Sequence, residues 1–477
     1  MPRKQIRTLL VAAVGAAAVL GQTPSAHAMT NEELLRIIRR QAEQIDVLTR
    51  KVEVLEQKTT ATEAGVEAAK EQAAEAQKTA EAADTGVEFK LGPAPTIRSK
   101  DGRFEFKVRG RLLTDFNLVR SGDDPRNVGG SRISTTSTEF RSARLGAEGT
   151  AWKDVKFTFE ADFADNAVDI TDAFIAYVGE PIKPAKYIRI GQYKTPNSLE
   201  EQTSGRFTTF MERAAFTDAF DFDRRIGIGT GFGGKQWTFD VGLFSQNNGD
   251  SGSSLNEGYA VAGRGTYAFT DVLGSADLMH VGASARFRDL SNQADNRRVR
   301  YRQRPFFHDT NRSVDTGTLR EADNDVIAGI EWAYVAGPLS LQAEAAHTWL
   351  NRDNADDADG LWGGYFDVSY FLTDDTRAYR SGRFDRVKVK NPVFGGGWGA
   401  WQVGGRFDYI DLNGDDVRGG EQYSIIGGVN WYLNDHARMM VNGAYTRVFN
   451  ARGMGGNQIE GSSNNIWGVG MRGQVDF

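Results

Sequence analysis

The sequence contains no cysteine at any of its 477 positions. This absence excludes disulfide bonds, thiolate metal sites and cysteine nucleophiles. Beyond the first 28 residues there is also no apolar run near the ~18 residues that a membrane-spanning helix requires. A strong positive charge is missing as well, since the net charge of -6 excludes a generally basic nucleic-acid-binding protein. Nucleic acid is therefore not among the expected partners.

Histidine is scarce, and no arrangement typical of a catalytic or metal site is present. Of the five histidines, His27 lies in the N-terminal leader, and the others show neither metal-ligand spacing nor a nucleophile elbow. Asp-rich stretches such as 353–359 do not follow the EF-hand order, which favours solvated loops over a calcium site. The sequence therefore predicts a protein that is not an enzyme and that holds no metal and no cofactor.

The abundant residues favour strands with one apolar and one polar face. Glycine occurs 54 times, and aromatic residues make up 11% of the chain. The mean hydropathy is -0.46 although 40% of the residues are apolar. A chain that is polar on average but rich in Gly, Phe, Tyr and Trp suits strands in which every second residue faces water.

The first 28 residues have the three parts of a secretory signal peptide. Arg3, Lys4 and Arg7 supply the positive region, and an apolar stretch follows over 9–20. Ala26-His27-Ala28 is a small-x-small cleavage site. The apolar stretch is too short for a membrane anchor, so we expect residues 1–28 to be cleaved after export.

Residues 29–84 have the composition of a long helix, with much Ala, Glu, Gln and Lys, no proline and a single glycine. Apolar residues recur every seven positions or at the partner position three or four residues away: Leu34, Ile38, Ile45, Leu48, Val52, Leu55 and Val66. This seam with charged flanks predicts a periplasmic α-helical coiled coil. β-branched residues at one position with Leu at the other favour two strands by the usual rule, and a monomeric helical spacer remains the alternative.

From about residue 87 the apolar residues recur at every second position, and we expect residues 87–477 to form one all-β domain. Phe104, Phe106, Leu112 and Phe116 alternate with Lys107, Arg109, Arg111 and Asp115. The same alternation is found in 155–163, 236–243, 279–288 and 401–409. Segments of ~9–11 residues with two such faces fit a transmembrane antiparallel β-barrel, although a soluble sandwich also alternates.

The end of the chain and its connections favour the membrane barrel. In 467–477 every odd position is apolar or Gly, and the last residue is Phe477, which resembles the closing strand of outer-membrane barrels. Connections alternate between short ones, at 233–234 and 336–338, and long polar ones, at 246–257 and 289–324. Short turns on one side and long extracellular loops on the other fit this class, and ~24 residues per strand and connection give about 16 strands.

Several motifs, in this order along the chain, resemble the phosphate-selective porins O and P. They are Gly110-Arg111-Leu112 with Asp115-Phe116, 140–146, Gly191-Gln192-Tyr193-Lys194-Thr195-Pro196, Phe210-Met211-Glu212-Arg213, 337–344, 370–373, 399–401, 411–413 and 428–434. The resemblance covers nearly the whole predicted barrel. It implies a homotrimer in the Gram-negative outer membrane, in contact with lipid and lipopolysaccharide, that passes small phosphate-type anions.

The resemblance also implies an arginine ladder leading to a constriction made by an inward-folded loop. Relatives carry a lysine twelve residues after the lysine of the Gly-Gln-aromatic-Lys motif; here that motif lysine is Lys194, and Arg206 stands twelve residues on. The family's two adjacent arginines are represented here by Arg141 and Ser142, so one arginine of the pair is missing. Arg144 comes two residues after Ser142. Glu200 and Glu201 add negative charge to the same region.

The residues expected to line the pore follow from strand register and from the resemblance. They are Lys107, Arg109, Arg111, Arg141, Arg144, Lys194, Arg206, Arg213 and Arg406, with Arg286 and Arg288 as further lumen-facing candidates. Arginine offers five fixed donors, and rings of such residues select anions in pores. The alternative is that these residues are held in ion pairs with acidic residues of the lumen, as in any porin, and do not contact the anion. We expect Arg312, in the extracellular loop 289–324, to lie away from the constriction.

Two other functions remain open at this point. Ser142 and the two glutamates are compatible with a general porin, or one that prefers carboxylates or cations, on the same fold. The coiled coil is compatible with a structural tether that crosses the periplasm and uses the barrel as its anchor. Ion selectivity separates the first alternative from an anion porin, and deletion of residues 29–84 tests the second.

Overall fold

The computed structural model describes residues 31–83, 86–122, 134–245, 258–272, 277–291, 297–353, 355, 358–450 and 463–477. The predicted signal 1–28 and the predicted loop 246–257 lie outside these residues. The chain divides into two compact units, one ending at Thr85 and one running from Gly86 to Phe477. None of the described helices is both long and apolar enough to cross a membrane.

The N-terminal unit contains one helix, α2 (Asn31–Ala83). Its sequence lacks proline and is rich in strong helix formers, which explains why it continues for 53 residues. In the single chain, side chains of the predicted seam are half to two-thirds exposed, at Ile45, Leu48, Val52 and Leu55. The helix is confirmed, whereas the coiled coil remains a prediction because it needs a partner strand.

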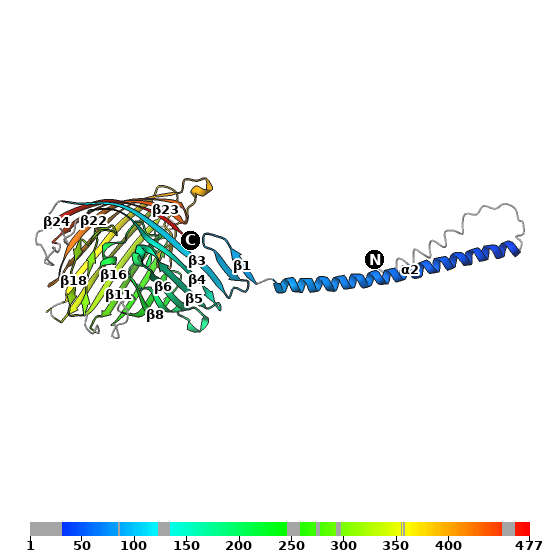
Figure 1. Ribbon diagram of the computed structural model, residues 1–477. Helices are drawn as coiled ribbons and strands as arrows, with labels where there is room; N and C mark the ends of the chain where they lie inside the picture. The colour runs from blue at the N-terminus through cyan, green and yellow to red at the C-terminus, as the bar shows by residue number, and fades with distance from the viewer. Residues whose placement is uncertain are drawn as a thin grey trace. The chain divides into compact units, whose positions relative to one another are not determined.

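The second unit is a closed antiparallel barrel of sixteen strands (Figure 1). The strands are β3 (Glu105–Ser121), β4 (Thr135–Ala151), β5 (Val155–Asp162), β6 (Asp169–Tyr177), β7 (Tyr187–Lys194), β8 (Arg224–Gly233), β9 (Trp237–Ser245), β10 (Tyr259–Thr270), β11 (Leu278–Asp289), β16 (Ala322–Ala336), β17 (Leu339–Arg352), β18 (Asp359–Phe371), β21 (Ala400–Asn413), β22 (Arg418–Asn434), β23 (Ala437–Phe449) and β24 (Ser463–Asp476). Each pairs with its neighbours along the chain, and β24 pairs with β3 from Ile466↔Ser121 to Asp476↔Arg111. The closing strand and the strand number are therefore confirmed.

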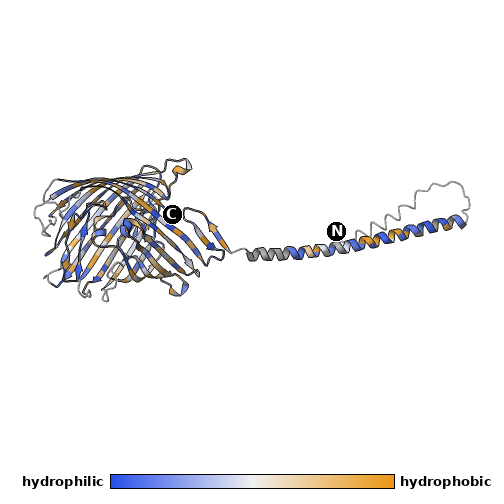
Figure 2. Ribbon diagram, viewed as in Figure 1, coloured by the Kyte–Doolittle hydropathy of each residue, from blue (hydrophilic) through white to orange (hydrophobic). Residues whose placement is uncertain are grey.

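The two faces of the wall explain why this sheet closes into a membrane barrel. Large apolar side chains point outward and stay exposed, as at Phe116 (55%), Ile330 (68%) and Ile425 (55%). Charged side chains point inward from the same strands, as Asp115 and Arg472 do. Figure 2 shows the resulting alternation along each strand. A soluble sandwich would bury its apolar face, so the outward apolar face excludes that alternative.

Two rims bound the barrel, and the shorter connections gather at one of them. We call the rim where β3 begins and β24 ends the proximal rim, and the opposite one the distal rim. At the proximal rim, residues 337–338 join β16 to β17, and Gly337 adopts φ +55° there, which glycine reaches without steric cost. A small extension, β1 (Val87–Lys90) with β2 (Thr96–Ser99), pairs onto the start of β3.

Strand length divides the wall into two parts. β5 to β9 contain 8 to 10 residues each, whereas β16, β17, β18, β21, β22 and β23 contain 13 to 17. At ~3.3 Å per residue and a tilt of about 40°, an eight-residue strand spans roughly 20 Å, less than the apolar band of ~25 Å of a lipid-facing barrel.

Three connections fold into the lumen and carry the smaller elements. Loop 195–223 holds α3 (Leu199–Gln202) and α4 (Ala215–Ala219) and enters from the distal rim. Loop 290–321 holds the short strands β12 (Arg298–Val299), β13 (Arg302–Gln303), β14 (Val314–Asp315) and β15 (Leu319–Arg320). Residues 372–399, called the arm below, hold β19 (Tyr379–Arg380), β20 (Arg383–Phe384) and η5 (Val393–Gly395). Between β5 and β6 lies η3 (Ala164–Asn166), and between β6 and β7 lies η4 (Glu180–Ile182).

Two expectations about these connections are wrong. The proximal rim was expected to carry only short turns, yet the arm of 372–399 starts and ends there. The loop predicted over 289–324 was expected to lie away from the constriction, yet its residues Tyr301 and Phe307 are about 1% exposed and belong to an apolar cluster inside the barrel. Its aromatic side chains pack on the other loop, with the Tyr301 and Phe220 rings 6.1 Å apart.

Candidate anion-binding site in the lumen

Loop 195–223 is held against the wall by side chains of distant strands. The carboxylate of Glu344 accepts the backbone N–H groups of Leu199 (2.8 Å) and Glu200 (2.7 Å). Asp408 accepts the N–H of Ala215 at 2.9 Å. Asn442 accepts the N–H of Met211 at 2.8 Å. These bonds satisfy the backbone of a buried loop and fix its position across the barrel.

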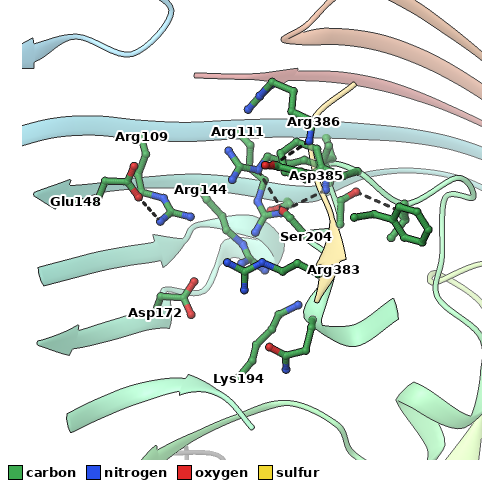
Figure 3. Close-up of a pocket in the computed structure, with 18 of the residues that line it drawn as sticks. Arg109, Arg111, Arg144, Glu148, Asp172, Lys194, Ser204, Arg383, Asp385 and Arg386 are labelled. Carbon is green, nitrogen blue, oxygen red and sulfur yellow. Dashed lines mark hydrogen bonds and ion pairs between the residues drawn. The ribbon is translucent and has the colours of Figure 1, made fainter. Parts of the chain in front are cut away.

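The loop and the arm leave a cavity of about 590 Å³ in the lumen. Of its lining residues, fifteen are Lys or Arg and four are Asp or Glu. The cations are Lys107, Arg109, Arg111, Arg141, Arg144, Arg189, Lys194, Arg206, Arg213, Arg224, Arg380, Arg383, Arg386, Lys388 and Arg472. Figure 3 shows side chains from the wall, the loop and the arm entering the same space. Eight of the predicted pore residues line this cavity, whereas Arg286, Arg288 and Arg406 do not.

The predicted ladder lies along β3 and shares two carboxylates of neighbouring strands. Lys107 Nζ lies 3.1 Å and Arg109 Nη1 2.9 Å from Glu148. Glu160 is within 2.9 Å of Arg109 Nε and 3.4 Å of Arg111 Nη2. These three cations and two carboxylates carry more positive than negative charge when the carboxylates are ionised, so donors outnumber acceptors along this strip.

Arg141 and Arg144 are engaged in tighter pairs. Arg141 grips Glu212 with two parallel bonds of 2.9 Å. Arg472 Nη2 lies 2.7 Å from the same carboxylate. Burial favours the neutral acid, but Arg141 and then Arg472 outweigh it and hold the pKa of Glu212 well below its ordinary value. Arg144 lies 2.7 Å from Asp162 and 3.1 Å from Glu160.

Lys194 and Arg213 share Glu201. Lys194 Nζ lies 2.9 Å from Glu201 Oε1, and Arg213 Nε lies 3.1 Å from Oε2. Lys194 also donates to the carbonyl of Glu201. The structure therefore brings the predicted motif lysine into the cavity, but with a carboxylate already bound to it.

Arg206 differs from these residues. It lines the cavity, and among the described residues no carboxylate lies within 4.0 Å of its guanidinium. Its Nε lies 3.2 Å from the Ser204 hydroxyl, and the Phe207 ring lies 5.1 Å away. Burial lowers the pKa of Arg206, and Asp476 partly opposes this. The group stays protonated at neutral pH and keeps free donors facing the cavity.

Arg406 does not line the cavity, so that prediction is wrong. Its side chain is fully buried beneath loop 195–223. It donates to Asp367 at 2.6 and 2.8 Å and also to Glu200. Arg286 and Arg288 are likewise buried: Arg286 donates to the Phe220 carbonyl at 2.6 Å, and Arg288 pairs with Asp325. These three arginines face inward as their register predicts, but they hold loops.

The expectation that Arg312 lies away from the constriction is also wrong. It lines a second cavity of about 350 Å³ together with Arg141, Arg144 and Arg213. Its Nη1 donates to Asp218 of α4. Arg312 therefore lies beside predicted pore residues and not away from them.

The sequence interpretation missed Arg189 and the arginines of the arm. Arg383 projects from β20 toward Arg144 (Figure 3), and Arg189 lies 4.5 to 4.6 Å from the rings of Phe174, Tyr187 and Tyr193. Neither has a carboxylate within 4.0 Å in the described part of the chain. A signal for the arm was present, because arginine recurs every third residue at 377, 380, 383 and 386.

Comparison with known proteins gives matches over most of the chain. Residues 106–450 match the family model described as phosphate-selective porin O and P. An uncharacterized protein of Caulobacter vibrioides is 35% identical over 369 residues, 76% of this chain and 71% of that protein. Porin O of Pseudomonas aeruginosa is 27% identical and covers 78% of this chain and 88% of its own. The structure of OmpT, an outer membrane protein of Vibrio cholerae, aligns with a TM-score of 0.48 and 11% identity over 79% of this chain and 98% of that one.

Proposed function

This chain belongs to the phosphate-selective porin O and P family, and from that premise we propose that it is an outer-membrane porin through which small anions, phosphate-type oxyanions among them, diffuse passively. The family match confirms the resemblance carried by the motifs. The observation that supports the anion preference most directly is the lumenal cavity, in which lining cations far outnumber lining acids. Among the residues that the structure describes, no carboxylate lies within 4.0 Å of Arg206, Arg383 or Arg189.

The proposed path uses two kinds of cation. Lys107, Arg109 and Arg111 share carboxylates, so an anion that reaches them exchanges with an existing partner and is held weakly. Arg206 presents donors that hold no carboxylate of the described residues to the cavity, and it would bind a pair of oxyanion oxygens bidentately. Weak binding before and after one stronger site lets an ion enter and still leave, which conduction requires.

The proposed roles of the other predicted residues follow from their partners. Lys194 and Arg213 contribute about one net positive charge together once Glu201 is subtracted. Arg141 is bound to Glu212 and helps to shape the constriction, whereas Arg144 sits between the ladder and Lys194. No cofactor and no catalytic group is assigned to the pore.

A cation-preferring or carboxylate-preferring porin is the less favoured alternative. Its main support was the pair Glu200 and Glu201 near the constriction. Glu201 is occupied by Lys194 and Arg213, and Glu200 is buried against Arg406. Neither glutamate presents a free carboxylate to a passing cation, so the charges that face the cavity favour anions.

We assign the distal rim to the extracellular side and the proximal rim to the periplasm. Lipid and lipopolysaccharide would surround the long-strand wall, whose outward face carries Trp362, Tyr409 and Trp467 toward the distal rim. Homotrimer contacts would lie on the short wall of β5 to β8, where the outward face is rich in isoleucine: Ile170, Ile175, Ile188, Ile190, Ile226 and Ile228. A wall too short for the bilayer and lacking an outward Trp or Tyr at its distal end is better covered by protein.

The helix α2 would assemble with copies of itself in the periplasm, since its apolar seam is exposed in one chain. At ~1.5 Å per residue its 53 residues extend about 80 Å. That length also keeps the tether function open as a second role. Sedimentation equilibrium of residues 29–84 gives the strand number, and a monomer would leave only the spacer interpretation.

The experiment that tests the main proposal is planar-bilayer recording of the purified protein in a chloride gradient. We expect a reversal potential of the anion-selective sign that weakens as salt rises, because the screening length falls from ~10 Å at 0.1 M to ~3 Å at 1 M. Added phosphate should block the chloride current. A cation-selective reversal potential at low salt would refute the proposal.

A further inference from the structure

The arm that enters the lumen also reaches the outside of the barrel. Inside, Tyr379 Oη lies 2.6 Å from His280 Nδ1, and the Gly382 carbonyl accepts a bond of 2.7 Å from Arg264. Both wall residues are buried in the lumen. The arm is therefore fastened to the inner face before it turns back toward the rim.

The last residues of the arm rest on the outer face of β21 and β22. The Trp398 carbonyl accepts the indole N–H groups of Trp401 (3.2 Å) and Trp431 (2.9 Å). Those two residues are register partners, and their rings stack at 5.1 Å. They share the outward face with Phe407 and Val429, which are 50% and 40% exposed. The arm thus straddles the proximal rim.

Two large apolar side chains stand free at this point. Phe394 is 75% exposed and Trp398 is 84% exposed, whereas Ile330, a highly exposed outward residue of the wall, is 68% exposed. They flank three consecutive glycines, 395–397, of which Gly396 has φ +85°. In Figure 1 the segment stands out from the end of the barrel as a short orange coil. Two large aromatic side chains exposed on one short segment indicate a surface that contacts a protein or a membrane.

The neighbouring strands indicate whether lipid or protein contacts Phe394 and Trp398. β21 and β22 belong to the long-strand part of the barrel, and their outward faces carry aromatic residues at both ends: Trp401 and Trp431 at the proximal rim, Tyr409 and Tyr423 toward the distal rim. Such paired belts mark a wall in contact with lipid. The short isoleucine wall, proposed above for subunit contact, is formed by other strands. Lipid therefore fits this position better than a second copy of the chain.

We propose that Phe394 and Trp398 form a membrane hook that inserts into the boundary between headgroups and acyl chains of the periplasmic leaflet. Trp and Phe favour this boundary because their rings are apolar while the indole N–H and the loop backbone remain close to water. The hook holds one end of the arm in the lipid, while the other end presents Arg383 to the pore. The inference rests on the proposed function only in requiring that the barrel lies in a bilayer.

The absence of cysteine in the chain makes a direct test possible. Phe394→Cys, labelled with an environment-sensitive fluorophore, is reconstituted in dioleoylphosphatidylcholine vesicles with phosphatidylcholine that carries a nitroxide either near the headgroup or deep in the acyl chain. Ser381→Cys, at the lumenal tip of the same arm, is the matched control. Val429→Cys, on the outward face of β22, reports whether the barrel is inserted.

We expect the shallow nitroxide to remove most of the fluorescence at position 394 and the deep one to quench position 429. Position 381 should be affected by neither. If position 429 is quenched while position 394 behaves like position 381, the proposed membrane contact of the hook is refuted, and the proposed porin function is unaffected. Blue-shifted but unquenched emission at position 394 would also refute it, in favour of a protein contact. If position 429 is not quenched either, membrane insertion of the barrel, and hence the proposed function, fails.

Discussion

Replacing Arg206 by glutamine should weaken phosphate binding in the pore more than any change to a paired arginine. The substitution removes a charge but keeps a planar, hydrogen-bonding side chain. The guanidinium donates to the Ser204 hydroxyl and lies over the face of Phe207, and no carboxylate of the described residues is left unpaired by its loss. The effect on folding should therefore be small, and the effect on conduction reports the site itself.

The size of the effect follows from the missing interaction. A hydrogen bond to a charged group contributes ~1.5–3 kcal/mol, and each 1.4 kcal/mol is about tenfold in affinity. At ~4 Å, a unit charge near a protein surface adds as much as about 4 kcal/mol before screening by neighbouring groups. We therefore expect the phosphate concentration for half-block of chloride current to rise roughly 10- to 150-fold. Arg206→Lys should keep most of the preference, and Arg206→Glu should abolish or reverse it.

The assay is phosphate block of chloride current in planar bilayers, with a control that changes the same cavity without changing its net charge. Arg380 and Asp385 both line the cavity and pair at 2.9 Å, so Arg380→Gln combined with Asp385→Asn removes one charge of each sign. This double variant should leave the block nearly unchanged. If it shifts the block as much as Arg206→Gln does, unpaired charge is not what selects the anion.

Three further predictions follow from the partners of other charged residues and from the wall. Glu201→Gln should increase anion selectivity in the same bilayer assay, because it leaves Lys194 without its carboxylate; a decrease would show that Glu201 only positions the loop. Arg406→Met should lower the melting temperature in detergent by an amount corresponding to ~3–5 kcal/mol, since buried carboxylates lose their partner, and an unchanged melting temperature would contradict the loop-holding role. Ile190→Asp should yield monomers by light scattering while Ile425→Asp, equally exposed on the opposite wall, should not; the same result for both would refute the trimer wall.

Strand faces could be predicted from the sequence because they depend on local alternation. Every segment predicted as a strand is one, and the odd-numbered face of β3 carries Lys107, Arg109 and Arg111 into the lumen as expected. The closing strand followed from the same rule. A period of two fixes which side chains face inward, whatever the remainder of the barrel does.

The loops could not be predicted, because their positions depend on single side chains far away in the sequence. Loop 195–223 is held by Glu344, Asp408 and Asn442, which lie on three different strands. No local pattern in the loop reveals these partners. The same packing explains the error at Arg406: its inward register was read correctly, but the loop that covers it turns a pore residue into a buried anchor.

The candidate site shows why counting arginines is a poor guide to selectivity. Most of the fifteen cations of the cavity are bound to carboxylates at 2.5 to 3.7 Å, and such a pair presents a dipole to a passing ion. Lys194, favoured by its motif, and Arg206, favoured only by its spacing, looked equivalent in the sequence; the position of one carboxylate, Glu201, separates them. A pore built in this way can carry a dense row of arginines without trapping the anion, since most of their charge is balanced by carboxylates and the few unpaired arginines determine where the ion stops.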